Sequence, residues 1–186
     1  PFLAIDMLTQ ANKLKLKGKD IVHMDVGEPG IRPPEYLLTH IQSLIGKENL
    51  GYTEPIGIPL LRDKISKHYK SWYGCEIDPS NIAVTAGASG AFVLSLLSLF
   101  DVGDEIAIMT PYYPAYINTL KTLGLKIKLI EGKVSNAFQP TLNTLKKYET
   151  NLKGLVIASP ANPTGSIIKK DEMILIAQWC KEKNIK

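Results

Sequence analysis

A rigid polar turn, SPANPTG at residues 159–165, follows the apolar run LVIA at residues 155–158. The run predicts a buried strand, and Pro160 and Pro163 stop further strand pairing. Between the two prolines, Asn162 offers an amide just past the carboxyl end of that strand. Ligands bind at this position in open α/β sheets, so Asn162 is a candidate binding residue. The alternative is a turn that is simply rich in turn-forming residues.

Small residues form a second candidate site, GASG at residues 87–90, between the apolar runs 82–85 and 91–100. We expect a strand, a tight turn and a helix in that order. The first N–H groups of a helix lack internal partners and carry partial positive charge, which suits a phosphate. Ser89 adds a hydroxyl donor. The glycine spacing fits neither the dinucleotide fingerprint nor the Walker loop, so phosphate binding and tight packing stay open as alternatives.

Three tyrosines crowd a third turn, PYYPAY at residues 111–116. One aromatic face there could stack on a planar ring, whereas Tyr112 and Tyr116 are better interpreted as core or interface residues. The three turns together offer phosphate donors, a flat aromatic ring and a rigid amide. A planar, phosphorylated, hydrogen-bonding cofactor would use all three.

Alternating strands and helices position these turns. The apolar patterns predict strands at residues 82–85, 105–110, 125–130 and 155–158, and helices at 2–17, 33–45, 60–74, 91–100, 111–124, 141–150 and 170–183. Strands that alternate with helices indicate βαβ units. The predicted fold class is therefore α/β, with a mainly parallel sheet flanked by helices.

Composition narrows the possible partners. The 186 residues are 45% hydrophobic, which is enough for a buried core. The net charge of +4 comes from scattered lysines, and the only arginines are Arg32 and Arg62, so we expect no nucleic-acid partner. The longest apolar run, residues 91–100, is too short to span a bilayer, so we expect no membrane partner. The cysteines and histidines show no metal-ligand or redox spacing, which favours a reducing, cytoplasmic compartment and no metal.

The ordered set of motifs resembles the pyridoxal-phosphate-dependent aminotransferases of class I/II, the fold-type I group. The motifs are DVGEP, GYTEPIGIPLLR, VTAGASGA, VGDEIAIMTPYYPAY and SPANPTG. The resemblance implies a helix with a small-domain portion over residues 1–30 and an incomplete cofactor-binding large domain over residues 31–186. It also implies a cytoplasmic homodimer of amino acid biosynthesis that moves an amino group between an amino acid and a 2-oxo acid.

The resemblance assigns cofactor-binding roles to five residues. Gly87, Ala88 and Ser89 would bind the phosphate of pyridoxal phosphate. Tyr113, the second aromatic residue after the proline of PYYPAY, would stack on the pyridine ring. Asn162 would donate its amide N–H to the phenolic oxygen of the cofactor, which stabilises the deprotonated oxygen.

Two further roles follow from the resemblance. Tyr52 would reach the phosphate of the neighbouring subunit, which implies active sites shared across a dimer, and Gly27 would lie beside the substrate carboxylate. The Schiff-base lysine of the family, its aspartate and its substrate-binding arginine are expected beyond Lys186. We therefore expect no catalytic residue in this sequence, which looks like an N-terminal fragment that is inactive alone.

Three other functions stay open. A lyase or synthase of the same fold would share these motifs. An aminotransferase-like effector domain of a transcription regulator would share them too, and would require a DNA-binding segment upstream. The third alternative is an α/β domain with a phosphate site but no cofactor chemistry.

Overall fold

The computed structural model describes residues 3–27, 29–47 and 51–186. The chain divides into two units, Pro1–Val84 and Thr85–Lys186. The candidate residues Gly87, Ala88, Ser89, Tyr113 and Asn162 lie in the second unit. The assignment of residues 1–30 to a small-domain portion and of 31–186 to the large domain stays a prediction.

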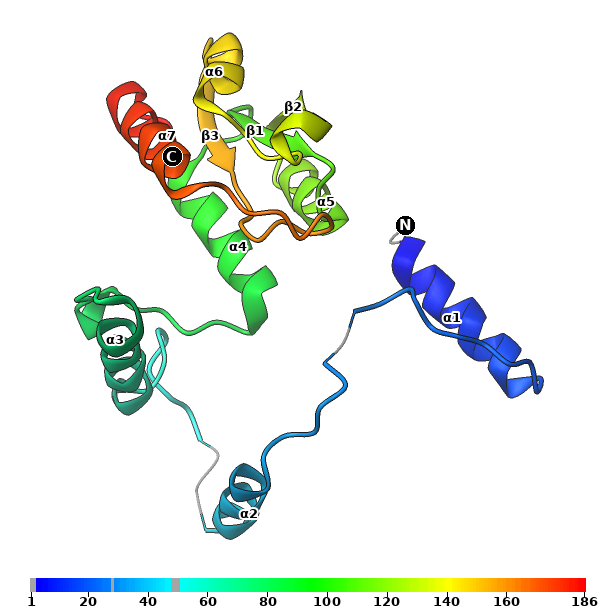
Figure 1. Ribbon diagram of the computed structural model, residues 1–186. Helices are drawn as coiled ribbons and strands as arrows, with labels where there is room; N and C mark the ends of the chain where they lie inside the picture. Colours follow the sequence, from blue (N-terminus) through cyan, green and yellow to red (C-terminus); the bar gives the residue numbers. More distant parts are fainter. Residues whose placement is uncertain (1–2, 28, 48–50) are drawn as a thin grey trace. The chain divides into compact units, whose positions relative to one another are not determined.

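Helices dominate the described part of the first unit (Figure 1). They are α1 (Leu3–Leu16), α2 (Glu35–Leu44), α3 (Pro59–Tyr73) and the short 3₁₀ helix η1 (Pro79–Asn81). Arg62 on α3 donates from Nε to the carbonyl of Gly57 and from Nη1 to the carbonyl of Pro79. The donor–acceptor distance is 3.0 Å in both bonds. This arginine therefore anchors backbone, because its guanidinium donors are directed at carbonyl groups of its own unit.

A parallel sheet forms the centre of the second unit. Its strands are β1 (Glu105–Thr110), β2 (Lys126–Glu131) and β3 (Leu152–Val156), in the order β2-β1-β3 (Figure 1). Ile106 pairs with Ile127 of β2 and with Gly154 of β3. At the other edge of β3, the N–H of Lys186 donates to Lys153 and the N–H of Leu155 donates to Lys186. The predicted α/β class with a parallel sheet is confirmed.

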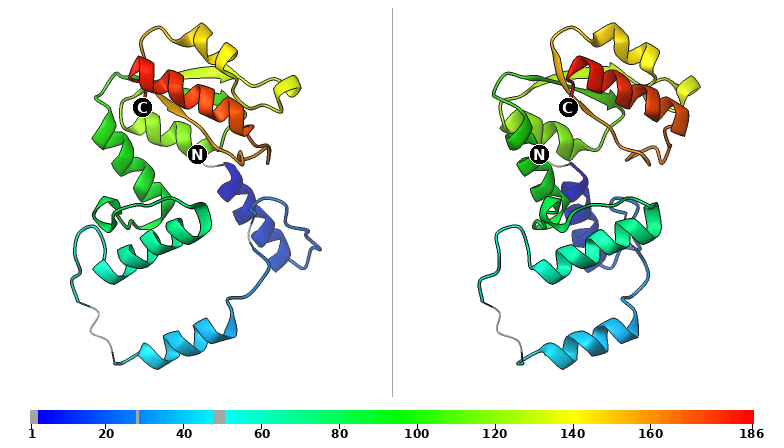
Figure 2. Two further views of the ribbon diagram at one scale, coloured as in Figure 1. Left: turned by 60° about the vertical axis from the view of Figure 1, so that its left-hand side comes forward. Right: turned by 90° about the vertical axis from the view of Figure 1, so that its left-hand side faces the viewer.

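Helices cover both faces of this sheet, and Figure 2 shows α5 and α7 on opposite faces. The helical segments of the unit are α4 (Gly87–Leu99), α5 (Pro114–Thr122), η2 (Val134–Asn136), α6 (Leu142–Leu145), η3 (Lys146–Tyr148) and α7 (Lys170–Lys183). No helix in the described ranges is both long enough and apolar enough to cross a lipid bilayer.

Two apolar cores result, because successive residues of a strand point to opposite faces. Ile106 of β1 packs into a core with Leu96, Leu120 and Leu125. The next residue, Ala107, belongs to the core on the other face, with Ile130, Leu145, Leu152, Ile176, Trp179 and Ile185. Burial on both faces holds β1 in place and fixes where its carboxyl end lies.

Two local predictions around α4 are wrong. Residues 82–85 are extended but form no strand, because a strand needs a partner and here Val84 donates a single backbone hydrogen bond to Ile56. The expected turn at residues 87–90 is the first turn of α4. Gly87 accounts for this, since its φ of 75° lets the chain enter the helix directly.

Two other elements differ in extent from the prediction. The expected helix at residues 141–150 is two short pieces, α6 and η3. The strand expected at residues 155–158 is β3, which begins three residues earlier, at Leu152. Gly154 explains the miss, because a glycine in a strand gives no apolar signal although it is buried here.

The two cysteines are expected to react at different rates. Cys75 is exposed, whereas Cys180 on α7 packs against the apolar core, and burial raises the pKa of its thiol. In the native protein at pH 8, iodoacetamide should modify Cys75 about tenfold faster than Cys180, since access and thiolate fraction both favour Cys75. Peptide mass spectrometry measures both rates, and in urea the two should converge. Equal rates in the native protein would contradict the partial burial of Cys180.

Candidate functional site

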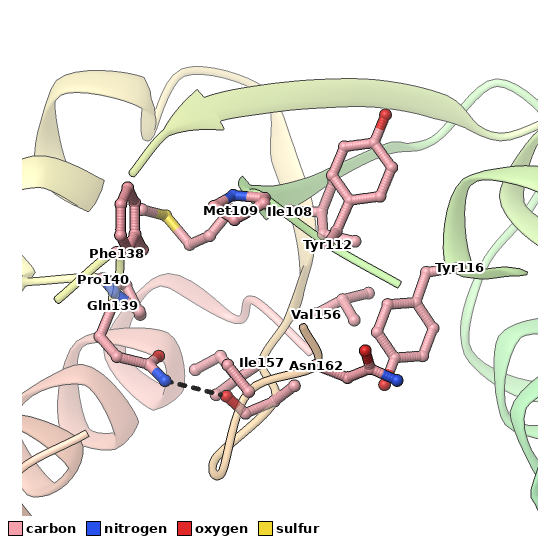
Figure 3. Close-up of a pocket in the computed structure, with 13 residues that line it drawn as sticks. Ile108, Met109, Tyr112, Tyr116, Phe138, Gln139, Pro140, Val156, Ile157 and Asn162 are labelled. Carbon is pink, nitrogen blue, oxygen red and sulfur yellow. Dashed lines mark hydrogen bonds between the residues drawn. The ribbon is translucent and has the colours of Figure 1, made fainter. Parts of the chain in front are cut away.

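A small cavity lies where β1 and β3 end, and Asn162 lines it (Figure 3). It offers about 30 Å³, room for about two water molecules and not for an aromatic ring. Its walls are Ile108, Met109, Pro111, Tyr112, Tyr116, Phe138, Gln139, Pro140, Val156, Ile157, Ala158, Ala161 and Asn162. The cavity therefore marks the place where the loops after β1, β2 and β3 meet.

Internal hydrogen bonds shape the loop at residues 159–166. Ser159 Oγ accepts from the N–H of Ile168 at 3.0 Å, and the hydroxyls of Thr164 and Ser166 lie 2.7 Å apart. The N–H of Ala161 donates to the carbonyl of Ser166 at 2.8 Å. The hydroxyl groups of the loop are thus used within the loop and around its base.

Asn162 is the exception in this loop. Its side chain is exposed, and within the described ranges its amide makes no hydrogen bond. An amide carries two N–H donors and an acceptor. A polar group at the tip of an internally bonded loop, next to the carboxyl end of β3, is available to a ligand that lies outside the cavity.

The tyrosines of PYYPAY occupy different positions. Tyr112 and Tyr116 line the cavity together with Asn162 (Figure 3). The ring of Tyr116 also stacks edge-on against Tyr113, with centroids 5.5 Å apart, and contacts Phe92 of α4 at 5.3 Å. Tyr113 precedes α5, as the residue that caps it, and is half-buried. The packing of Tyr116 agrees with a core residue, yet no sequence pattern indicates that it borders Asn162.

The small residues Gly87, Ala88 and Ser89 form the first turn of α4 and are exposed. Figure 1 shows that α4 begins away from the sheet and runs toward it, and none of the three residues lines the Asn162 cavity. The structure thus offers a helix start without bulky side chains. A cofactor shared by this turn, Tyr113 and Asn162 stays a prediction.

The remaining two candidates, Gly27 and Tyr52, belong to the first unit. Both are exposed there. Their expected contacts with substrate and with a neighbouring subunit stay predictions.

Gln139 is a residue of this site that sequence reasoning missed. It lines the cavity, is 6% exposed and donates hydrogen bonds to the loop that carries Asn162. A glutamine within FQP belongs to no chemical motif. The one available signal was its place between the apolar Phe138 and Pro140, a pattern that favours burial.

Comparison with known proteins decides the family. The model of the family "Aminotransferase class I and II" matches residues 19–186. The chain belongs to this aminotransferase family. A valine–pyruvate aminotransferase of Mycobacterium tuberculosis is 36% identical over all 186 residues, which cover 48% of that protein. A (5-formylfuran-3-yl)methyl phosphate transaminase of Methanocaldococcus jannaschii is 33% identical over 91% of this chain and 44% of its own.

Solved aminotransferase structures share the fold. A crystal structure of an aminotransferase from Mycobacterium tuberculosis matches with a TM-score of 0.95 at 36% identity, over 100% of this chain and 48% of that one. The chain spans about half the length of the aminotransferases it matches. The motif-based resemblance to this family is confirmed.

Proposed function

We propose that the full-length protein containing this chain is a pyridoxal-phosphate-dependent transaminase. It would move an amino group from an amino acid to a 2-oxo acid. The observation that carries the proposal is the amide of Asn162, which makes no hydrogen bond to the described residues and lies near the carboxyl end of β3 in a chain of the aminotransferase family. The proposal concerns the full-length protein, because the chain covers about half of its relatives.

The chemistry of the available donors fits pyridoxal phosphate. The start of α4 offers backbone N–H groups and the Ser89 hydroxyl, without large side chains around them. Tyr113 offers an aromatic face, and Asn162 offers an amide. These groups suit a phosphate, a pyridine ring and a phenolic oxygen in turn. When bound, the cofactor supplies an electron sink for removal of the α-proton of an amino acid.

The residues of this chain would bind and orient rather than transfer the proton. Gly87, Ala88 and Ser89 would bind the phosphate, and Tyr113 would hold the ring in one plane. Asn162 would donate to the phenolic oxygen and so favour its deprotonated form. None of these five residues is proposed as the base that removes the α-proton.

Substrate binding and assembly complete the proposal. Gly27 would lie beside the substrate carboxylate, since a residue without a side chain leaves the backbone accessible. Tyr52, fully exposed in its own unit, would reach the phosphate of a neighbouring subunit in a homodimer. Both cysteines are free thiols, which agrees with the cytoplasm as the place of a biosynthetic enzyme.

The first test is cofactor binding followed by turnover. The purified full-length protein should acquire a visible absorbance band with pyridoxal phosphate. It should then convert one of valine, alanine or aspartate to its oxo acid in the presence of pyruvate or 2-oxoglutarate. Valine with pyruvate is the first pair to try, because an aminotransferase named for that pair is 36% identical. Ammonia release without an oxo acid acceptor would instead indicate a lyase, and a missing band would contradict the proposal.

A further inference from the structure

Gln139 reaches across the sheet edge to the loop that carries Asn162. Its Nε2 lies 2.6 Å from the carbonyl oxygen of Ser166 and 3.3 Å from that of Ala158. Figure 3 draws the bond to Ala158 as a dashed line. Ala158 and Ser166 flank residues 159–165, so one amide is bonded to both ends of the segment that contains Asn162.

Burial increases the free-energy cost of losing these bonds. Gln139 is 6% exposed and lies beside the buried Pro140. Without Gln139, the carbonyl of the half-buried Ala158 would lose this donor, and an acceptor left unpaired away from water costs more than the bond itself contributes. Ser166 also offers its Oγ to the same nitrogen at 3.2 Å, and its carbonyl accepts from Ala161 as well. The side chain of Gln139 is therefore the link between the loop after β2 and the loop after β3.

The backbone around Gln139 is arranged to deliver this side chain. Ala137 and Phe138 both have positive φ, 49° and 61°, values that non-glycine residues seldom adopt. The N–H of Gln139 donates to the carbonyl of Asn136 at 2.9 Å. The chain thus turns sharply after η2 and presents the Gln139 amide to the neighbouring loop.

We propose that Gln139 is a positioning residue that holds the Asn162 amide in place for its ligand. We call its bonds to Ala158 and Ser166 the Gln139 bridge. The inference rests on the proposed function, because the ligand is the cofactor to which Asn162 donates. Gln139 itself touches neither cofactor nor substrate in this proposal. Without the bridge, the two ends of the segment separate and Asn162 samples several positions.

The test uses Gln139→Met in the full-length protein. Methionine keeps the length of the side chain and removes its donors. The matched control is Gln178→Met on the exposed surface of α7. Two quantities are measured: the pH midpoint of the absorbance change of bound pyridoxal phosphate, and amide hydrogen exchange of residues 159–168 in the cofactor-free protein.

The expected result has two parts. Exchange at Ala161, Gly165 and Ile168 should become about tenfold faster, as the loss of an ordinary hydrogen bond predicts, while the amides of β1 stay unchanged. The absorbance midpoint should move up, in the direction that Asn162→Ala moves it. In an Asn162→Ala background, Gln139→Met should cause no further shift, since both changes act on one contact.

Other outcomes overturn the inference. An unchanged midpoint in a cofactor-bound variant, or unchanged exchange at residues 159–168, removes the bridge as a positioning device. Faster exchange in β1, with a midpoint shift that adds to that of Asn162→Ala, indicates a general structural role instead. A wild-type protein that binds no cofactor refutes the proposed function separately, and the exchange measurement then decides on the bridge by itself. Gln139→Asn, whose shorter amide cannot reach both carbonyls, replaces the methionine variant if that one fails to fold.

Discussion

Replacing Asn162 by alanine is expected to raise the pH midpoint of the bound cofactor's absorbance by roughly one to two units. The Asn162 amide would donate to a deprotonated phenolic oxygen, and a hydrogen bond to a charged group contributes about 1.5–3 kcal/mol. One pH unit corresponds to about 1.4 kcal/mol. The bond favours the deprotonated form, so its loss moves the midpoint up and not down. A spectrophotometric pH titration of the full-length protein measures the midpoint.

Two variants sharpen this experiment. Asn162→Asp should shift the midpoint at least as far, because a carboxylate offers no donor and repels the oxygen. Asn118→Ala, at an exposed asparagine of α5, is the matched control and should leave the midpoint unchanged. A wild-type midpoint in Asn162→Ala would refute the assigned contact, while leaving cofactor binding itself in place.

Replacing Gly132 by alanine is expected to lower the free energy of unfolding by about 3 kcal/mol, the upper end of the cost of overpacking. Gly132 follows β2, and its N–H donates to the carbonyl of Thr110 at the end of β1, with a donor–acceptor distance of 3.0 Å. An added Cβ would collide with that same carbonyl and would lie 3.0 Å from the carbonyl oxygen of Phe138. These are backbone atoms, so no side-chain rotation relieves the collision.

The collision at residue 132 should also disturb the candidate site, because Phe138 directly precedes Gln139. Urea-induced unfolding of the full-length protein measures the loss of stability. Gly30→Ala is the control, since a Cβ there meets no other atom within 4 Å, and it should cost less than about 0.5 kcal/mol, as surface changes usually do. Equal stability of the two variants would show that the close contact between residue 132 and the Thr110 carbonyl tolerates a side chain.

Local patterns in the sequence were enough for much of the fold. The apolar pattern that predicts each strand or helix lies within the segment that forms it, so it can be recognised without knowledge of the packing partners. The parallel sheet followed from the alternation of strands with helices. Two predictions failed where packing partners matter. The segment 82–85 has a strand-like sequence but pairs with no strand in the described part of the chain, and buried Gly154 carries no apolar side chain.

Some residues of the candidate site were likewise predictable from local sequence, and others were not. Family motifs made Asn162, Tyr113 and the small residues at the start of α4 candidates for cofactor binding, because each proposed role requires a residue type at a fixed place in its own segment. The sequence motifs therefore indicate the family, and the alternation of apolar patterns predicts the parallel α/β sheet and the loops that carry candidate residues. Only the tertiary structure placed Gln139 against residues 158 and 166 and Tyr116 beside Asn162. These contacts join side chains that are distant in sequence, and they depend on strand order and on the path of the loop after β2, which no local pattern encodes.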